Sequence, residues 1–299
     1  MKNKIKIIYE DNHLLVCEKP VNMPVQADSS GDEDLLSTVK AYIKEKYSKP
    51  GEVYLGLVHR LDRPVGGVMV FARTSKAAAR LTESFKNRKT KKRYAAIVSG
   101  SPCSSAELEC DLLRDEQNNI SRVVRPNTPG AKTASLEYVS TVTKNGFTLL
   151  DVLLHTGRHH QIRAQLAWSG CPIFGDQRYN RAARVGQQIA LYAYSLTIEH
   201  PTLRESMTFT CIPHGAKFDE FSDECAGVRC AYIDNNLICV NKSSGISCTV
   251  EDGGSDTLEA RLNSAFGKVY PLHRLDAPTS GLVLFARNAK TAAVLVEAI

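Results

Sequence analysis

Two segments of this chain are nearly the same, and no other feature limits its fold as strongly. HRLDRPVGGVMVFAR occupies 59–73, and HRLDAPTSGLVLFAR occupies 273–287. When 59–81 is aligned with 273–295 without gaps, 13 of the 23 positions are identical. The two segments lie too far apart for a short-period solenoid, so the sequence predicts a duplicated domain.

The segments upstream of the repeat correspond as well, because DNHLLVCEKP at 11–20 resembles DNNLICVNKS at 234–243. We therefore expect a complete first copy over 1–216, a polar linker over 217–230 and a partial second copy over 231–299. The second copy stops within an expected helix. This favours a fragment of a longer tandem protein over a decayed duplicate.

The first copy has the pattern of an α+β fold. The apolar run GGVMVFA at 66–72 predicts a buried strand, and the spacing of apolar residues over 34–47 predicts a helix. Asn145-Gly146 between two apolar segments predicts a hairpin, because both residues tolerate a positive φ. A loop and helix are expected over 156–170. Because most strands are joined by hairpins, we expect a mixed, antiparallel-rich central sheet with flanking helices, followed by a partial repeat of that fold.

Charge is distributed unevenly along the chain. Residues 1–216 hold 30 Lys and Arg against 21 Asp and Glu, whereas 217–299 hold 8 against 11. A basic first copy suits a polyanionic partner such as RNA. The run KNRKTKKR at 86–93 is expected to contact a nucleic-acid backbone, although such runs are commonly just solvated. Tyr94 follows directly and could stack on a base or be an ordinary strand aromatic.

Several classes of protein are disfavoured by what the sequence lacks. The nine cysteines form no CxxC pair, so we expect reduced thiols rather than a disulfide framework, and the last four lack the spacing of a zinc ribbon. No nucleotide-binding or metalloprotease motif occurs, so we expect no cofactor and no metal. Without a signal peptide or an apolar span, we expect a cytoplasmic protein with no membrane partner. The oligomeric state cannot be read from the sequence.

The repeated motif offers one carboxylate in a constrained turn. Asp62 is flanked by Arg60 and Arg63, and Pro64 and Gly66 follow it. Neighbouring arginines favour the charged form of a carboxyl group, and a carboxylate can act as a nucleophile or a base. The alternative is a structural ion pair within the turn.

A second basic motif, TGRHHQIR at 156–163, spans the end of the loop and the start of the helix expected over 156–170. It places Arg158, His159 and His160 at the start of that helix and Arg163 in its first turns. These residues could contact a phosphate or pair with a catalytic acid, because helix N-termini attract anions. The alternative is a solvated, basic helix start.

These motifs together resemble one family. HRLDRPVGGVMVFARTSKAAARL is similar to the signature of the RluA-type RNA pseudouridine synthases, HRLDxxTSG followed by an apolar strand and alanine. The resemblance spans 5–213 and continues in family order. Its further segments are the opening at 11–20, KKRYAAIVSG at 91–100, TGRHHQIRAQL at 156–166, GCPIFGDQRY at 170–179 and LYAYSLTIEHP at 191–201.

The resemblance implies an isomerase that converts specific uridines of structured RNA, ribosomal or transfer, into pseudouridine without a cofactor. By the family pattern Asp62 is the catalytic aspartate, and Arg163 pairs with it. Tyr94 packs against the base and takes part in proton transfer, while Arg60 helps to shape the site. The target uridine would be flipped out of its stack.

One departure from the family keeps other functions open. Val65-Gly66 stands where the family has Thr-Ser, whereas the second copy has Thr279-Ser280. If the hydroxyl pair orients the carboxylate, the first copy would be a non-catalytic RNA-binding or RNA-folding protein. A glycoside hydrolase is a further alternative, but it needs two carboxylates, and Asp176 is the nearest second candidate.

Overall fold

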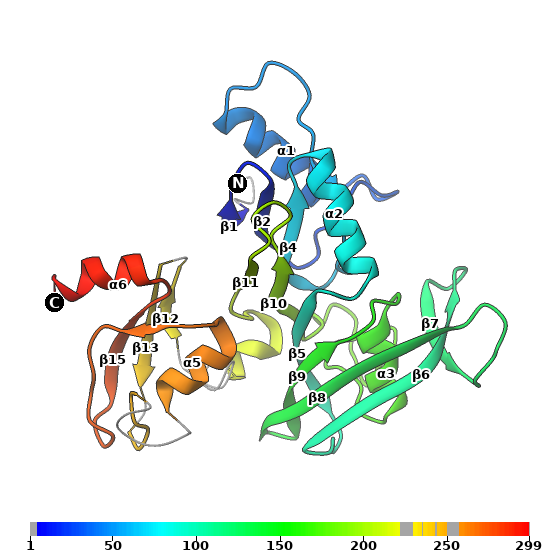
Figure 1. Ribbon diagram of the computed structural model, residues 1–299. Helices are drawn as coiled ribbons and strands as arrows, with labels where there is room; N and C mark the ends of the chain where they lie inside the picture. The colour runs from blue at the N-terminus through cyan, green and yellow to red at the C-terminus, as the bar shows by residue number, and fades with distance from the viewer. Residues whose placement is uncertain (1–4, 222–229, 235, 243, 250–256, 299) are drawn as a thin grey trace. The chain divides into compact units, whose positions relative to one another are not determined.

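The computed structural model describes residues 5–221, 230–234, 236–242, 244–249 and 257–298. The chain divides into two compact units, Met1–Asp219 and Glu220–Ile299. None of the helices in these described ranges has the length and apolar character needed to cross a membrane. Each unit has its own sheet and is described separately (Figure 1).

The first unit is built on one mixed sheet of 11 strands in the order β1-β2-β4-β10-β5-β9-β8-β6-β7, with β3 paired to β4 and β11 to β10. Its strands are β1 (Lys6–Glu10), β2 (Leu14–Lys19), β3 (Gly56–Leu57), β4 (Gly66–Ala72), β5 (Lys91–Ser99), β6 (Ser105–Asp115), β7 (Ile120–Val124), β8 (Lys132–Lys144), β9 (Phe147–Leu154), β10 (Leu191–Glu199) and β11 (Ser206–Thr210). The pairing of β4 with β10 is parallel, and the remaining pairings among these strands are antiparallel. The expected α+β class and antiparallel-rich sheet are therefore confirmed.

The strands follow the local sequence closely. Every residue of β4 is buried, as expected for a strand with neighbours on both edges. The β8–β9 hairpin turns at Asn145 and Gly146, whose φ values of 53° and 77° are those of the predicted turn. At the start of β4, a Cβ on Gly67 would lie 2.2 Å from the Ala193 carbonyl oxygen, so only glycine allows the close approach of β10.

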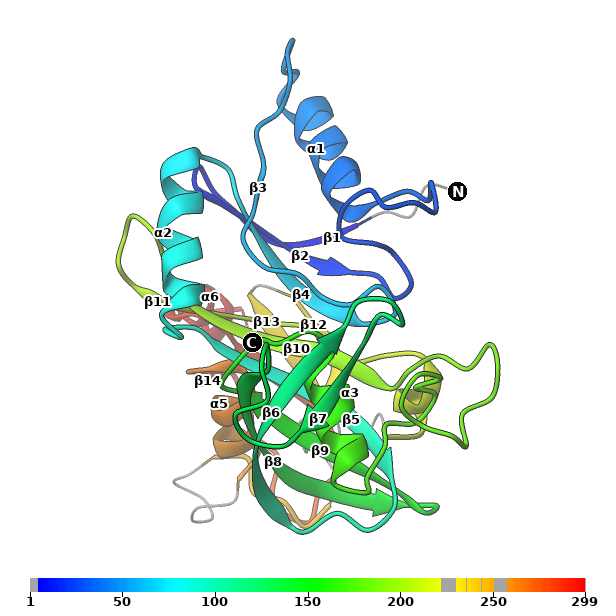
Figure 2. The ribbon, with the colours of Figure 1, turned by 90° about the vertical axis from the view of Figure 1, so that its right-hand side faces the viewer.

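Three α-helices pack on this sheet: α1 (Leu35–Lys46), α2 (Ser75–Lys86) and α3 (Gln161–Trp168). Asp34 caps α1 by accepting from the Ser37 amide, and Thr74 caps α2 by accepting from the Ala77 amide. Helix α2 contacts β3 and β4, whereas α3 contacts β6 and β7, so the helices lie on two halves of the sheet (Figure 2).

The loop and the helix expected over 156–170 are both present. Helix α3 begins at Gln161, directly after His160, which takes a left-handed conformation with φ 50°. The helix expected over 34–47 is α1, which ends at Lys46, and Tyr47 is its exposed C-cap. The start of the expected linker 217–230 lies in a 3-10 helix, Ala216–Phe221, and 222–229 lie outside the described residues.

The second unit has a sheet of four strands in the order β12-β13-β15-β14. Its elements are β12 (Cys230–Ile233), β13 (Leu237–Lys242), α5 (Leu258–Phe266), β14 (Tyr270–Pro271), β15 (Gly281–Ala286) and α6 (Ala289–Val296). Apolar residues of β13, α5 and β15, among them Ile238, Leu262 and Phe285, form its core. In chain order these elements run strand, strand, helix, strand, strand, helix, as β1 to α2 do in the first unit.

Candidate active site

A pocket of about 1580 Å³ opens in the first unit where several loops meet. It is lined by the turn between β3 and β4, the end of α2, the start of β5, the β6–β7 hairpin and the loop into α3. Asp62, Tyr94 and Arg163 all line this pocket, and so does Arg60. The sheet therefore brings together all four residues singled out in the sequence, which come from three separate motifs.

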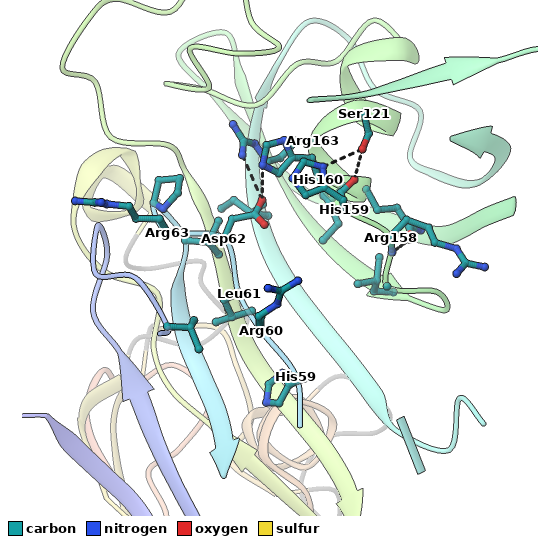
Figure 3. A pocket seen from close by; sticks show the side chains of 18 of the residues that line it. His59, Arg60, Leu61, Asp62, Arg63, Ser121, Arg158, His159, His160 and Arg163 are labelled. Carbon is teal, nitrogen blue, oxygen red and sulfur yellow. Dashed lines mark hydrogen bonds and ion pairs between the residues drawn. The ribbon is translucent and has the colours of Figure 1, made fainter. Parts of the chain in front are cut away.

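The Asp62 side chain points toward Arg163 on α3 (Figure 3). Arg163 Nη1 donates to Asp62 Oδ2 at 3.2 Å. The other nitrogens face Asp176: Nε donates to Oδ2 at 2.8 Å and Nη2 to Oδ1 at 2.7 Å. Such a two-point contact fixes the plane of a guanidinium, so Asp176 sets the direction in which Arg163 reaches Asp62.

Burial separates the roles of the two carboxylates. The Asp176 side chain is 0% exposed, and the Asp62 side chain is 29% exposed. Asp176 is held by Arg163, and its Oδ1 also accepts from the Arg178 amide at 3.1 Å. Of these two carboxylates, only Asp62 is thus open to a molecule in the pocket. A glycoside hydrolase needs two carboxylates that flank the bond, so this arrangement disfavours that alternative.

His160 also faces Asp62, with its Nε2 3.5 Å from Asp62 Oδ2. Burial, together with the charge of Arg163, lowers the pKa of His160 to about 3, so the ring is neutral near pH 7. Its Nδ1 lies 3.1 Å from the Tyr179 hydroxyl, which already accepts from the Ser121 amide. A neutral imidazole that accepts from Tyr179 at Nδ1 carries its proton at Nε2, facing Asp62.

A buried lysine, Lys19, binds the backbone of the turn that carries Asp62. The Val65 amide donates to the Asp62 carbonyl at 2.9 Å, which closes the turn. Lys19, at the end of β2, donates from Nζ to the carbonyls of Arg63, Pro20 and Met23 at 2.9, 2.8 and 2.6 Å. Burial lowers the pKa of Lys19 to about 7. These bonds tie the turn to the sheet.

Tyr94 and Arg60 differ in exposure. Tyr94 lies on β5 and is 9% exposed, and burial, reinforced by the charge of Asp62, raises the pKa of its hydroxyl well above the usual range. It therefore presents a neutral aromatic surface to the pocket. The Arg60 side chain is exposed and makes no hydrogen bond or ion pair within the part of the chain that the structure describes.

The basic run 86–93 has two kinds of members. Lys86 and Arg88 are exposed and line the pocket, where they can meet an anion. Arg93 instead pairs with Asp151, and Lys92 donates weakly to the Thr156 carbonyl at 3.5 Å. Burial lowers the pKa of Lys92 to about 8. The expected nucleic-acid contact therefore concerns only part of the run.

The second basic motif is also divided. Arg158 points away from Asp62 (Figure 3), and its Nε donates to the Thr133 carbonyl at 3.0 Å. The His159 ring stacks on His160 with 3.8 Å between centroids, and its carbonyl accepts from the Ser121 hydroxyl. His160 is the N-cap residue of α3, but its ring makes no capping hydrogen bond and contacts Asp62 and Tyr179 instead.

Sequence reasoning missed two residues of this site. Lys19 carried a signal, because a lysine next to a proline at the end of an apolar strand is placed to be buried. Asp176 enters the sequence argument only as a second acid, and its pairing with Arg163 across 13 positions has no local signal. The described residues contain no group of three or more His, Cys, Asp or Glu placed to hold a metal ion.

Comparisons with known proteins all find RNA pseudouridine synthases among the similar sequences. A sequence model described as RNA pseudouridylate synthase matches 13–168 and 236–299. The chain is 34% identical over 220 residues to an uncharacterized RNA pseudouridine synthase of Aquifex aeolicus, a match that covers 69% of this chain and 68% of that protein. Ribosomal large subunit pseudouridine synthase D of Zymomonas mobilis is 31% identical over 216 residues, with 69% and 68% covered.

The fold is similar to that of solved structures as well. Human RNA pseudouridylate synthase domain containing 4 superposes with a TM-score of 0.59 at 26% identity, over 70% of this chain and 88% of that one. Human RNA pseudouridylate synthase domain containing 1 gives a TM-score of 0.55 at 21% identity, over 71% and 84%. This chain therefore belongs to the RluA-type family of RNA pseudouridine synthases, which are isomerases.

Proposed function

We propose that the first unit isomerises a uridine of ribosomal RNA to pseudouridine, with Asp62 as its catalytic residue. The observation that carries this proposal is the partly exposed Asp62 carboxylate in the pocket, 3.2 Å from an arginine that is itself held by a buried aspartate. Relatives named for the large ribosomal subunit support the choice of RNA.

The reaction suits this set of side chains. The bond between uracil N1 and ribose C1′ breaks, a bond between C5 and C1′ forms, and the C5 proton leaves for solvent while N1 regains one. The net change is redox-neutral and needs no group donor, so we propose no cofactor. Asp62 acts on the sugar or base, and Arg163 stabilises its negative charge while it does so.

Tyr94 and Arg60 have separate parts in this proposal. The flat Tyr94 ring packs against the uracil once the nucleotide has been flipped out of its stack. Its neutral hydroxyl is available as a proton donor or acceptor near C5. Arg60, exposed and free to turn toward the phosphate backbone, helps to hold the flipped nucleotide.

We also propose that the second unit is a partial repeat of the first. The same contacts recur in both units, beyond the identical sequence. In the first unit, Lys19 bonds to the Arg63 carbonyl, and the Val70 amide donates to His59 Nε2 at 3.0 Å. The corresponding Lys242 bonds to the Ala277 and Thr279 carbonyls, and the Leu284 amide donates to His273 Nε2 at 3.1 Å.

The turn itself also has a counterpart in the second unit. The Thr279 amide donates to the Asp276 carbonyl at 2.9 Å, as Val65 does to Asp62. Within residues 1–299, no described segment after β15 corresponds to the strand of Tyr94 or the helix of Arg163. We therefore assign the catalysis of this sequence to the first unit.

Release of tritium from RNA labelled at uracil C5 tests this function, because isomerisation replaces that hydrogen and the reaction mixture holds no methyl donor for substitution at C5. Ribosomal RNA from cells that lack this protein is incubated with the wild type and with Asp62→Ala, and transfer RNA serves as the comparison. Release by the wild type alone, from ribosomal RNA, is the expected result. If the wild type binds RNA as tightly as Asp62→Ala and releases no label from either RNA, the protein is the non-catalytic RNA binder considered above.

A further inference from the structure

An aromatic ring lies against the first residue of β4, directly after the turn that carries Asp62. A Cβ on Gly66 would lie 2.6 Å from Cε2 and 3.0 Å from Cζ of Tyr192. A separation of 2.6 Å is too short for any side-chain carbon, so a residue larger than glycine here would displace the ring or the strand. The Tyr192 ring occupies the space where another side chain would lie.

The ring cannot move aside easily. Tyr192 is 1% exposed, and its hydroxyl donates to Glu18 Oε1 at 2.6 Å. Glu18 lies on β2 and also pairs with Lys6 at 3.3 Å. Tyr192 itself lies on β10, where it is opposite Gly66 on one side and Ala95 on the other. It is therefore fixed by the sheet, by a hydrogen bond and by packing.

Val65 links the contact between Gly66 and Tyr192 to the turn that carries Asp62. Val65, which precedes Gly66, is 2% exposed, and its amide closes the turn on the Asp62 carbonyl. The next residue, Gly67, is held against Ala193 of β10. Gly66 is thus the point at which β10 sets the path of the chain as it leaves the turn, and a shift there would carry Asp62 with it.

The second unit differs at this position. Ser280 aligns with Gly66, and Ser280 is exposed. In the described part of that unit, β15 pairs with β13 and β14, and no third strand lies beside Gly281 as β10 lies beside Gly67. The described part of the second unit therefore holds no counterpart of the contact between Gly66 and Tyr192.

We propose that Tyr192 is a positioning residue for Asp62 and that Gly66 and Tyr192 form a matched pair, each required by the other. This inference rests on the proposed function for its kinetic consequence, but not for its structural one. It also accounts for the departure from the family at Val65-Gly66: the ring takes over the support of the turn that a side chain would otherwise give.

The kinetic test uses Gly66→Ser alone and together with changes at Tyr192. Single-turnover tritium release is measured with enzyme in saturating excess, so that a smaller folded fraction alone does not alter the rate. We expect Gly66→Ser to slow the reaction by about 10-fold to 100-fold, the size of effect that a small misplacement of a reacting group produces. Adding Tyr192→Leu, which removes the opposing ring atoms, restores the rate to within about 3-fold of Tyr192→Leu alone.

Two controls distinguish the effect of the Tyr192 ring from that of its hydroxyl, and the loss of Gly66 from the loss of any glycine. Tyr192→Phe keeps the ring and removes the bond to Glu18, so it should not rescue Gly66→Ser. Gly51→Ser adds the same side chain where a Cβ meets nothing within 4 Å, and it should leave the rate unchanged. If Gly66→Ser acts at the wild-type rate, or if Tyr192→Leu fails to rescue it, the proposal is wrong.

Hydrogen–deuterium exchange tests the pair without any activity. In Gly66→Ser, or in Gly66→Ala if the serine variant does not fold, amides of the 59–66 segment should exchange faster, because the Val65 amide loses its place on the Asp62 carbonyl. Tyr192→Leu should restore slow exchange there. If Tyr192→Leu restores slow exchange in the glycine variants but the wild type releases no tritium, the proposed function is wrong and the matched pair stands. Unchanged exchange in both glycine variants would overturn the pair.

Discussion

Asp176 holds Arg163 with both of its carboxylate oxygens, at 2.8 and 2.7 Å, and both side chains are almost completely buried. Both residues belong to the wall of the pocket, where they are far less exposed than Asp62. A guanidinium bound in this way has one nitrogen, Nη1, left for Asp62, and cannot turn toward another acceptor. The substrate-facing carboxylate is therefore oriented by a second carboxylate that never needs to touch the substrate.

Asp176→Asn should weaken both the fold and the reaction. Removing the charge of Asp176 leaves the buried Arg163 with only its single contact to the partly exposed Asp62, and we expect a loss of about 3 kcal/mol in the free energy of unfolding. Urea unfolding at pH 7.5 measures this loss. The matched control is Glu52→Gln, an exposed acid outside the pocket, which should change little. Equal losses in the two variants would mean that Arg163 needs no anchor.

Asp62→Asn should reduce tritium release by at least about 100-fold, because the amide can neither accept a proton nor attack as a carboxylate does. Asp276→Asn makes the same change in the corresponding turn of the second unit and should leave the rate as it is. The two rates are compared under single-turnover conditions. A loss of activity in Asp276→Asn would assign a catalytic part to the second unit.

Acid should destabilise the protein partly through His160. Its pKa falls from 6.5 in the unfolded chain to about 3 in the fold, so the unfolded state binds the extra proton between these values. The contribution is complete above pH 6.5 and is lost as the pH falls toward 3, by about 1 kcal/mol per pH unit at most.

Unfolding free energies between pH 7.5 and 4.5 check this linkage. We expect the decline to be less steep in His160→Gln than in the wild type by about that amount per pH unit. His155→Gln, at a more exposed histidine, is the control. Parallel slopes for wild type and His160→Gln would show that His160 takes up its proton in the folded protein as well.

Lys86→Gln should weaken RNA binding and make it less dependent on salt. Lys86 is exposed at the pocket, and removing one cation that meets a phosphate lowers the slope of log K against log salt by about one. Lys76→Gln removes the same charge from the same helix, α2, away from the pocket, and should change affinity little. Filter binding at several salt concentrations distinguishes the two variants. Equal slopes of log K against log salt would mean that RNA does not contact Lys86.

Local structure was predictable where one short segment determined it. The apolar run of β4 and the Asn145-Gly146 hairpin each depend on neighbours in sequence, and both are as expected. The pairing of β4 with β10 was not foreseen, because its partners are far apart in the chain and no local pattern marks a parallel neighbour.

Strands β6 and β7 were also missed. The first eight residues of β6, SAELECDL, alternate polar and apolar side chains, so the sequence does carry the signal of a strand with one more buried face. In the candidate site, Asp62, Tyr94 and Arg163 were found through motifs. The anchor Asp176 and the neutral His160 depend on three-dimensional contacts that the motifs do not contain.

The parallel pairing of β4 with β10 has a consequence for how the protein is made. All residues from Gly66 to Tyr192 must be translated before the strand beside the Asp62 turn can form. This pairing joins residues far apart in sequence, so it forms late in folding. During synthesis the turn leaves the ribosome long before its neighbour does. A nascent chain therefore carries the Asp62 carboxylate before β10 can fix the path of its turn. Under the function proposed above, the chain can modify RNA only after most of its first unit has been translated.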